Sequence, residues 1–381
     1  MISLSIIGSR GIPAKYGGFE TFVEKLCLGL PRNQYSITVV CDAEQRKTMS
    51  SEFKLENVNL VYSRFYKQKN PLMFYLESVF LGIRSSSIIY CCGAGAGYFS
   101  FIPKFFGKTF IVNPDGVGWK RAKWNLLIRS ALRSLFRASS IFSEYIVCDS
   151  RAIKVLFNSQ FKRSKNIEVI EYGTDLFPQE TVDKIYKNDV LKKYGLSHKG
   201  YHLVVSRLEP ENNVSMIIDG YIKSRSIYPL VIVGNLQNTS YVNNLKSSAN
   251  NCSNIIFLGG IYNSSELKIV RSSSITYLHG HSVGGTNPSL LEAMGSQNLC
   301  ICHDNEFNRE VMDQYGIFFS SASDLAEKLS EVNPLNLTDR QKFLINGSYE
   351  RARDFYNWNL IVKKYDDFFK SIYREKNLKH L

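Results

Sequence analysis

The sequence contains no hydrophobic run that approaches the roughly 18 residues of a membrane-spanning helix, so we expect no transmembrane segment. Its eight cysteines form no framework, because only Cys300 and Cys302 are separated by a single residue and no second such pair completes a zinc site. Most cysteines lie in apolar stretches, which is typical of reduced core residues. Residues 1–8 show no basic leader and predict a first strand. We therefore expect a cytoplasmic protein.

Several motifs of common enzyme classes are also absent. There is no G-x-x-x-x-G-K-[ST] phosphate loop, no G-x-S-x-G nucleophile turn and no Asp-x-Asp pair that would hold a divalent ion beneath a nucleotide sugar. The ATPase and α/β-hydrolase classes thus lose their main support. We predict neither a metal site nor a cofactor, and we interpret His279 and His281 as structural residues rather than metal ligands.

Acidic residues are too few to balance the basic ones, and the formal charge at pH 7 is +13. Residues 1–175 hold 24 Lys and Arg against 13 Asp and Glu, whereas residues 176–381 hold 23 against 21. The basic first half favours an anionic partner, which is nucleic acid, an anionic membrane or a phosphorylated ligand. No helix-turn-helix or RNP sequence accompanies the charge, so a nucleic-acid-binding protein is only an alternative.

The length of 381 residues exceeds that of one typical hydrophobic core and predicts two domains. Short β-rich runs alternate with helical stretches as far as residue 171, and the alternation starts again at residue 202, which is typical of doubly wound parallel sheets. We predict an α/β protein with two Rossmann-like domains that face each other across a cleft. The expected parts are an acceptor-side domain at 1–176, a linker at 177–199, a second domain at 200–355, and a C-terminal helix at 356–381 that returns to the first domain.

A long glycine-rich loop follows the first predicted strand. It spans residues 8–20 and contains Gly8, Gly11, Gly17 and Gly18 before a segment with helical apolar spacing. Glycines allow a ligand to approach the backbone closely. Because the loop is longer and richer in glycine than an ordinary connection, we favour a ligand-binding role over a simple turn.

A second glycine run, at residues 93–97, follows a strand and precedes Asp115 at the end of the next strand, as in a dinucleotide-binding fold. The G-x-G-x-x-G spacing fails, since the third glycine would fall on Tyr98 or Ser100. We interpret the run as a loop lining the cleft or as backbone packing. A NAD-dependent oxidoreductase is kept as the alternative enzyme.

The most informative stretch is residues 281–294, where Gly284 and Gly285 lead into a helix that begins near Asn287. Backbone N–H groups at such a helix start favour a phosphate, and Glu292, inside the helix, is placed to accept hydrogen bonds from sugar hydroxyls. Arg207, at the end of a strand, can pair with a diphosphate or form a salt bridge to a neighbouring glutamate. These residues predict a site for a nucleotide diphosphate sugar.

A basic segment connects Asp115 to the next helix. It places cations between two tryptophans, and the helix carries Arg129, Arg133 and Arg137 on one face. Basic residues beside tryptophans are typical of the boundary of an anionic membrane. The alternative is a solvated face on an otherwise buried helix.

This set of motifs resembles that of the family 4 glycosyltransferases, which have two Rossmann-like domains in the GT-B arrangement, over nearly the whole chain. The corresponding segments are residues 17–20, 171–175, 206–208, 231–234, 256–259 and 287–294. More narrowly, residues 7–24, 115–116 and 119–124 resemble a bacterial subgroup that includes rhamnosyltransferases of capsule and O-antigen assembly.

By that resemblance, Glu292 would bind the ribose hydroxyls and Arg207 the diphosphate, while backbone N–H groups at residues 285–287 and around Gly18 would hold phosphates or sugar. Transfer would proceed with retention and without an enzyme nucleophile, because the leaving diphosphate is stabilised electrostatically. Asp115 is a candidate for orienting or deprotonating the acceptor, or else a turn-forming residue before Gly116.

Two residues depart from the family pattern. Gly284 stands where the first carboxylate of a Glu-x7-Glu pair is usual, and Asn212 stands where a lysine commonly accompanies Arg207. We expect either a different sugar or compensation by His281 or Lys15. An inactive sugar-nucleotide-binding relative is a further alternative.

We therefore predict a retaining glycosyltransferase, bound peripherally to the inner face of the cell membrane, that moves L-rhamnose from dTDP-rhamnose to a lipid-diphosphate-linked saccharide of the cell surface. The predicted catalytic residues are Arg207 and Asp115. The predicted donor-binding residues are Gly17, Gly18, Arg207, Asn212, His281, Gly284, Gly285, Thr286, Asn287 and Glu292. The residues predicted to meet the acceptor or the membrane are Trp119, Lys120, Arg121, Lys123 and Trp124.

Overall fold

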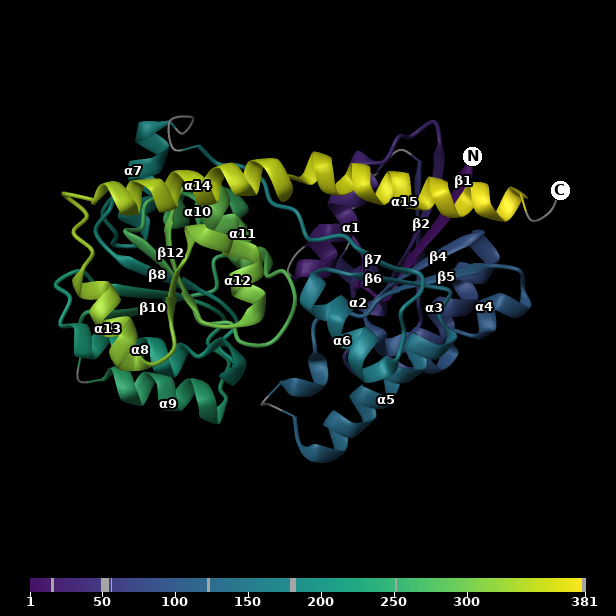
Figure 1. Cartoon of the computed structure of the whole chain (residues 1–381), viewed down its shortest axis with the longest axis horizontal. Helices are drawn as coiled ribbons and strands as arrows, with labels where there is room; N and C mark the ends of the chain where they lie inside the picture. Colours follow the sequence, from purple (N-terminus) through teal and green to yellow (C-terminus); the bar gives the residue numbers. More distant parts are fainter. Residues whose placement is uncertain are drawn as a thin grey trace. The chain divides into compact units, whose positions relative to one another are not determined.

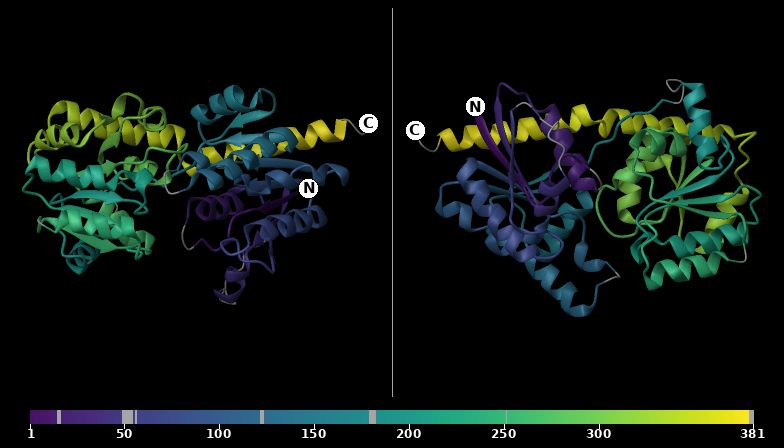
Figure 2. Two further views of the ribbon diagram at one scale, coloured as in Figure 1. Left: turned by 90° about the horizontal axis from the view of Figure 1, so that it is seen from below. Right: turned by 180° about the vertical axis from the view of Figure 1, so that it is seen from behind.

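The computed structural model describes residues 1–14, 17–48, 55, 57–121, 124–178, 183–250 and 252–378. The chain divides into two compact units, each with one sheet (Figure 1). The first unit comprises Met1–Lys120, Trp124–Tyr172 and Trp358–Leu381, and the second comprises Arg121–Lys123 and Gly173–Asn357. In both units helices cover the two faces of the sheet (Figure 2).

The sheet of the first unit is parallel and has the order β3-β2-β1-β4-β5-β6-β7. The central strands are apolar and buried, as expected when helices cover both faces. Because β1 pairs with β2 on one side and β4 on the other, the winding reverses between β1 and β4. The strands are β1 (Ile2–Ile7), β2 (Tyr35–Cys41), β3 (Val58–Tyr62), β4 (Ile88–Cys92), β5 (Thr109–Asn113), β6 (Tyr145–Cys148) and β7 (Ile167–Val169).

The helices of the first unit include the last helix of the chain, which follows the second unit in sequence. In that helix, Tyr365 packs its ring 5.0 Å from that of Phe22 and shares a 2.9 Å hydroxyl contact with Tyr90. The helical elements are α1 (Gly18–Gly29), α2 (Ala43–Thr48), α3 (Pro71–Ser85), η1 (Ala94–Phe99), α4 (Ile102–Phe105), η2 (Gly118–Lys120), α5 (Leu126–Phe142), α6 (Arg151–Phe161) and α15 (Trp358–Leu378).

The sheet of the second unit is also parallel and has the order β10-β9-β8-β11-β12-β13. Its winding reverses between β8 and β11. Branched and aromatic side chains from both faces form a buried core around Ile232, Leu278 and Ile301. The strands are β8 (His202–Val205), β9 (Leu230–Val233), β10 (Ile255–Gly259), β11 (Thr276–His279), β12 (Leu299–His303) and β13 (Ile317–Phe319).

The helices of the second unit start within the segment expected as a linker. Residues 184–193 form helix α7, and the Lys193 ammonium of this helix lies 2.8 Å from the Glu266 carboxylate of α10. The helical elements are α7 (Lys184–Lys193), η4 (Pro210–Asn212), α8 (Val214–Ser224), α9 (Ser240–Ala249), α10 (Ser264–Ser272), α11 (Pro288–Gly295), α12 (Glu306–Met312), η5 (Asp313–Tyr315), α13 (Ala322–Ser330) and α14 (Asp339–Phe355). The predicted class of two doubly wound α/β domains is confirmed.

Candidate functional site

The switch point of the second sheet brings two of the predicted segments together. Arg207 follows β8, and residues 280–287 follow β11, its neighbour in the sheet. Ligands of doubly wound folds bind where the winding reverses, beyond the carboxyl ends of such strands. The Arg207 guanidinium is exposed and makes no hydrogen bond or ion pair with another residue that the structure describes. It is thus available for an anion.

The loop at residues 280–287 is held by the segment that follows Arg207. The Ser282 backbone N–H and hydroxyl both donate to the Glu211 carbonyl at 2.9 Å, and the Asn213 amide donates to the Gly280 carbonyl at 2.8 Å. A Cβ at Gly280 would lie 2.1 Å from the Asn212 carbonyl oxygen, so this approach requires glycine. The two strand ends of the switch point therefore form one rigid structure.

Asn212 and His281, both predicted to bind the donor, contact each other. The Asn212 amide N–H donates to the Arg207 carbonyl at 2.7 Å, which leaves its oxygen to accept from His281 Nδ1 at 2.7 Å. Burial, followed by the charges of Arg121 and Arg207, lowers the pKa of His281 to about 3. His281 is consequently neutral near pH 7, and the pair fixes the backbone of Arg207 to the loop.

The backbone of Gly284 explains why no carboxylate stands at this position. Its φ is +143°, outside the conformations that residues with a side chain readily adopt. A Cβ would also lie 3.0 Å from His281 Nε2. A glutamate here would require a different loop conformation.

The start of α11 is capped by its own side chain. The Asn287 side-chain oxygen accepts from the Ser289 backbone N–H and from the Ser289 hydroxyl, both at 3.0 Å, and Pro288 has no N–H. The first turn thus offers few donors to a ligand. The backbone N–H groups of Gly285 and Asn287 donate to no other described residue, so they remain the predicted phosphate ligands.

Glu292 is held by a residue that the sequence did not single out. The Arg271 guanidinium, on α10, donates to Glu292 Oε2 at 2.6 Å. The Arg271 side chain is 2% exposed and that of Glu292 is 43% exposed, so the ion pair joins the core to the surface. Arg271 follows the apolar residues Ile269 and Val270 and precedes a strand that starts near residue 275. A cation in such an apolar stretch is the sequence signal that would have identified Arg271.

In the first unit, the loop after β1 is organised by carboxylates of α1. The Arg10 backbone N–H and its Nε both donate to Glu20 Oε1, at 3.0 and 3.2 Å. Gly17, at the start of α1, has a φ of +122°, and a Cβ there would meet Glu20 Oε2 at 2.1 Å. The turn itself therefore requires this glycine. Gly18 is exposed, and its predicted contact with a ligand stays a prediction.

Asp115 follows β5 and has a left-handed backbone, with a φ of +67°. Its N–H donates to the Asn113 side-chain oxygen at 3.0 Å, a local turn contact. The residue is half-buried at the carboxyl edge of the sheet. This geometry accounts for an aspartate in the turn, and the catalytic role stays a prediction.

The glycines at residues 93–97 are explained by packing. A Cβ at Gly95 would lie 2.0 Å from the ring of Tyr75, and one at Gly97 would lie 2.2 Å from the Leu135 carbonyl oxygen of α5. Helix η1 thus lies directly against α3 and α5. The packing interpretation accounts for these glycines without a dinucleotide.

Trp119, which we predicted to meet the acceptor or the membrane, is buried in the first unit. It is 8% exposed, and its ring lies 4.4 Å from that of Phe136 and 5.7 Å from that of Phe161. The local reason is that η2 turns the indole onto α5 and α6, where burial of the ring is favourable.

The remaining residues of this segment differ in exposure. Arg121 is largely buried, with its Nε 3.8 Å from Glu211 Oε1. Burial raises the pKa of Glu211. Trp124 is half-buried and Lys120 is exposed. Lys123 lies outside the described residues, as does Lys15.

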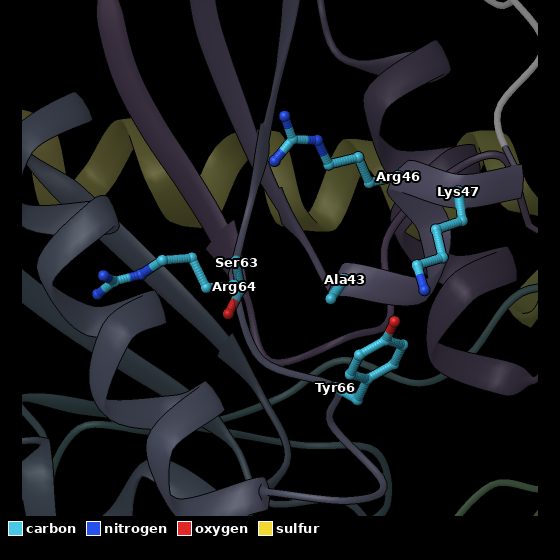
Figure 3. A pocket seen from close by; sticks show the side chains of 6 residues that line it. All are labelled: Ala43, Arg46, Lys47, Ser63, Arg64 and Tyr66. Atoms are coloured by element: carbon cyan, nitrogen blue, oxygen red, sulfur yellow. The ribbon is translucent and has the colours of Figure 1, made fainter.

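A basic cavity of about 550 Å³ lies beyond the carboxyl ends of β2 and β3 (Figure 3). The Lys47 ammonium and the Tyr66 hydroxyl point toward one another, and this contact raises the pKa of Lys47. Arg64 is paired with Glu77 at 2.6 Å. The cavity is lined by Ala43, Arg46, Lys47, Ser63, Arg64 and Tyr66, a set suited to an anion.

Among the described residues, no group of three or more His, Cys, Asp and Glu side chains is arranged to hold a metal ion. Within the same residues, no helix has both the length and the apolar character needed to cross a bilayer.

Comparisons with known proteins divide the chain near the boundary between the two units, which lies between Tyr172 and Gly173. Residues 1–70 and 75–175 match a domain of unknown function (DUF1972), and residues 187–351 match the family described as glycosyl transferases group 1. A comparison with curated protein sequences gave no match.

Solved structures share the fold along almost the whole chain. Sucrose-phosphate synthase from Thermosynechococcus elongatus superposes with a TM-score of 0.83 at 12% identity, covering 98% of this chain and all of that one. A glycosyltransferase from Rickettsia africae gives 0.75 at 16% identity, covering 97% and 98%. Anabaena HepE, solved with UDP-glucose, gives 0.75 at 15% identity, covering 97% and 100%.

The chain has the GT-B fold of two parallel-sheet α/β domains, and the match at residues 187–351 supports a glycosyltransferase. Its second unit carries a group 1 glycosyltransferase domain.

Proposed function

We propose that the protein is a retaining glycosyltransferase that transfers a sugar from a nucleotide diphosphate to a lipid-diphosphate-linked saccharide in cell-surface polysaccharide synthesis. The observation that carries the proposal is the convergence of an exposed arginine and a glycine-rich loop on one switch point. Arg207 and residues 280–287 both lie at the carboxyl edge of the second sheet, inside the group 1 domain.

In the proposed reaction the donor diphosphate lies between the Arg207 guanidinium and the N–H groups of Gly285 and Asn287. Glu292 accepts hydrogen bonds from the ribose through the carboxylate oxygen that Arg271 does not occupy. As the sugar–phosphate bond breaks, the diphosphate takes up the electron pair, and the positive groups stabilise that charge. The acceptor hydroxyl attacks from the same face, and Asp115 orients it or takes its proton.

We propose L-rhamnose from dTDP-rhamnose as the donor, with UDP-sugars as the competing class because HepE was solved with UDP-glucose. The test incubates the purified protein with a panel of nucleotide sugars and a synthetic lipid-diphosphate sugar, and detects products by mass spectrometry. Transfer from dTDP-rhamnose alone supports dTDP-rhamnose as the donor. Transfer only from a UDP-sugar would show that the donor is that UDP-sugar instead. Donor binding without transfer to any acceptor would indicate an inactive sugar-nucleotide-binding protein.

Variants test the site separately from the donor. Arg207→Ala should lower kcat by about 100-fold, in line with the loss of one oxyanion-stabilising group. Glu292→Ala should mainly raise the donor KM. The controls are Arg340→Ala and Glu327→Ala, which remove exposed charges of the same unit. Wild-type kinetics in both site variants would show that the donor binds elsewhere.

We place the acceptor diphosphate in the basic cavity of the first unit. The replacements Arg46→Ala and Lys47→Ala should raise the KM for the lipid-linked acceptor several-fold without changing the donor KM. Arg84→Ala, an exposed cation on α3, is the matched control. An unchanged acceptor KM would rule out the cavity as the acceptor site.

A further inference from the structure

The surface formed by α4 and α5 is unusually apolar. Of the 24 large hydrophobic side chains that are exposed among the described residues, nine lie between residues 98 and 142. Single exposed hydrophobic residues are normal on a soluble protein, whereas a concentration of them marks an interaction surface. We call this region the α4–α5 surface, defined by Phe101, Phe105, Phe106, Leu126, Leu127 and Phe142.

The aromatic side chains of this surface contact one another. The ring of Phe101 lies 6.1 Å from that of Phe105 and 5.6 Å from that of Phe142, both in edge-on contact. The Tyr98 hydroxyl donates to the Ser134 hydroxyl of α5 at 2.6 Å. The phenylalanines are thus presented by a fixed scaffold, with Phe105 80% exposed.

Helix α5, labelled in Figure 1, carries the rest of the surface. Leu126 and Leu127, both at least 80% exposed, lie at its start, and Phe142 lies at its end. At about 1.5 Å per residue, the helix spans roughly 25 Å. Leu126 and Phe142 therefore lie at opposite ends of this helix.

The charges on the same surface have one sign. Helices α4 and α5 contain Lys104, Arg129, Arg133 and Arg137 and no acidic residue, and the first acid after α5 is the exposed Glu144. Lys104, Arg133 and Arg137 are exposed on α4 and α5. Exposed phenylalanine and leucine side chains among cations match an anionic lipid interface, with its negative headgroups above an apolar layer.

The charge pattern argues against a second copy of the chain as the occupant. In a symmetric dimer the same patch meets itself, so Arg133 and Arg137 would face like charges with no acid to balance them. A bilayer containing anionic lipids provides the missing negative charge.

We propose that the α4–α5 surface is the membrane-docking face of the protein, with the phenylalanines of α4 inserted among the lipids and the arginines of α5 on the headgroups. In this proposal the α4–α5 surface, and not the buried Trp119, contacts the membrane. The proposal extends the proposed function, since a lipid-linked acceptor is reached at a membrane. Vesicle binding is nevertheless measured without donor or acceptor, so the two proposals fail independently.

The experiment is co-sedimentation of the full chain with two kinds of vesicle, one of phosphatidylcholine alone and one that also contains about 30% phosphatidylglycerol. Both are measured at low and at high salt. We expect binding to the anionic vesicles that weakens with salt. The pair Phe105→Ser and Phe106→Ser should lower the partition coefficient roughly tenfold or more, and Arg133→Glu with Arg137→Glu should abolish the preference for phosphatidylglycerol.

The matched controls are Ile227→Ser with Leu335→Ser, which remove exposed apolar side chains of the second unit, and Arg340→Glu with Lys342→Glu. They should bind vesicles as the wild type does, and circular dichroism should show that all variants are folded. The proposal is overturned if the surface variants bind like the controls or if the wild type binds no vesicles. It is also overturned if sedimentation equilibrium shows a dimer that the surface variants dissociate.

Discussion

At the scale of single residues, Glu292 connects donor binding to stability. Its carboxylate is the ion-pair partner of Arg271, whose side chain is 2% exposed. A buried cation that loses its partner retains the penalty of desolvation, although the partial exposure of Glu292 reduces the effect.

We predict that Glu292→Ala lowers the free energy of unfolding by about 1–3 kcal/mol, as measured by urea denaturation at pH 7. Glu327→Ala, an exposed glutamate of α13, should stay within about 0.5 kcal/mol of the wild type. The double replacement Arg271→Met and Glu292→Ala should recover part of the loss. Equal stability of Glu292→Ala and Glu327→Ala would contradict this account.

Gly284 supplies a second prediction at this scale, because its φ of +143° and the 3.0 Å approach to His281 leave no place for a side chain. Gly284→Ala should lower the free energy of unfolding by about 1–3 kcal/mol, and Gly284→Glu should not improve donor affinity. Gly259→Ala is the control, since that glycine has a φ of +75° and open space around it. A smaller effect at Gly284 than at Gly259 would mean that the loop rearranges easily.

At the scale of elements, the close packing of η1 on α5 depends on glycine. We predict that Gly97→Ala lowers the free energy of unfolding by about 2 kcal/mol, because its Cβ would press on the Leu135 carbonyl. Gly118→Ala, where the nearest atom is 4.0 Å away, should cost less than about 1 kcal/mol. Thermal denaturation measures both, and NADH should shift neither the wild type nor the variants. A shift with NADH would revive the dinucleotide interpretation.

Elements were also the level at which the sequence was most informative. The apolar spacing after the first glycine-rich loop predicted a helix there, and α1 spans Gly18–Gly29. Helix α7 was missed, because residues 184–193 are mostly polar and bury only Val190 and Leu191. A helix with so small an apolar face leaves a weak periodic signal.

At the scale of the whole molecule, the histidines with shifted pKa values all lie in one of the two units. Among the described residues His198, His202, His279, His281 and His303 lie in the second unit, and burial is the main cause that lowers the pKa of each. The pKa of His202 is lowered to about 4. Unfolded histidine titrates near 6.5, so below that pH the unfolded chain binds protons that the folded unit does not. The stability of the second unit is therefore complete above about pH 7 and declines as the pH falls.

We predict that acid unfolds the second unit before the first. Between pH 7 and 5, the buried His202, with a folded pKa of about 4, removes about 2 kcal/mol. The three tryptophans Trp119, Trp124 and Trp358 belong to the first unit, so their fluorescence reports on it, whereas far-ultraviolet circular dichroism reports on both. The dichroism transition in urea should move ahead of the fluorescence transition at pH 5. Equal shifts of the two transitions would show that the units unfold together.

The amino-acid sequence by itself determined the two α/β domains and the segments of the switch point, because strand and helix periodicities and glycine-rich loops are local properties of the chain. The tertiary structure decided which side chains those segments use. It buried Trp119, bonded His281 to Asn212, and placed Arg271 beneath Glu292. The partners in the two bonded pairs lie 21 or more positions apart in the sequence, and the burial of Trp119 depends on packing between elements. A local sequence pattern carries no information about the distance between such side chains.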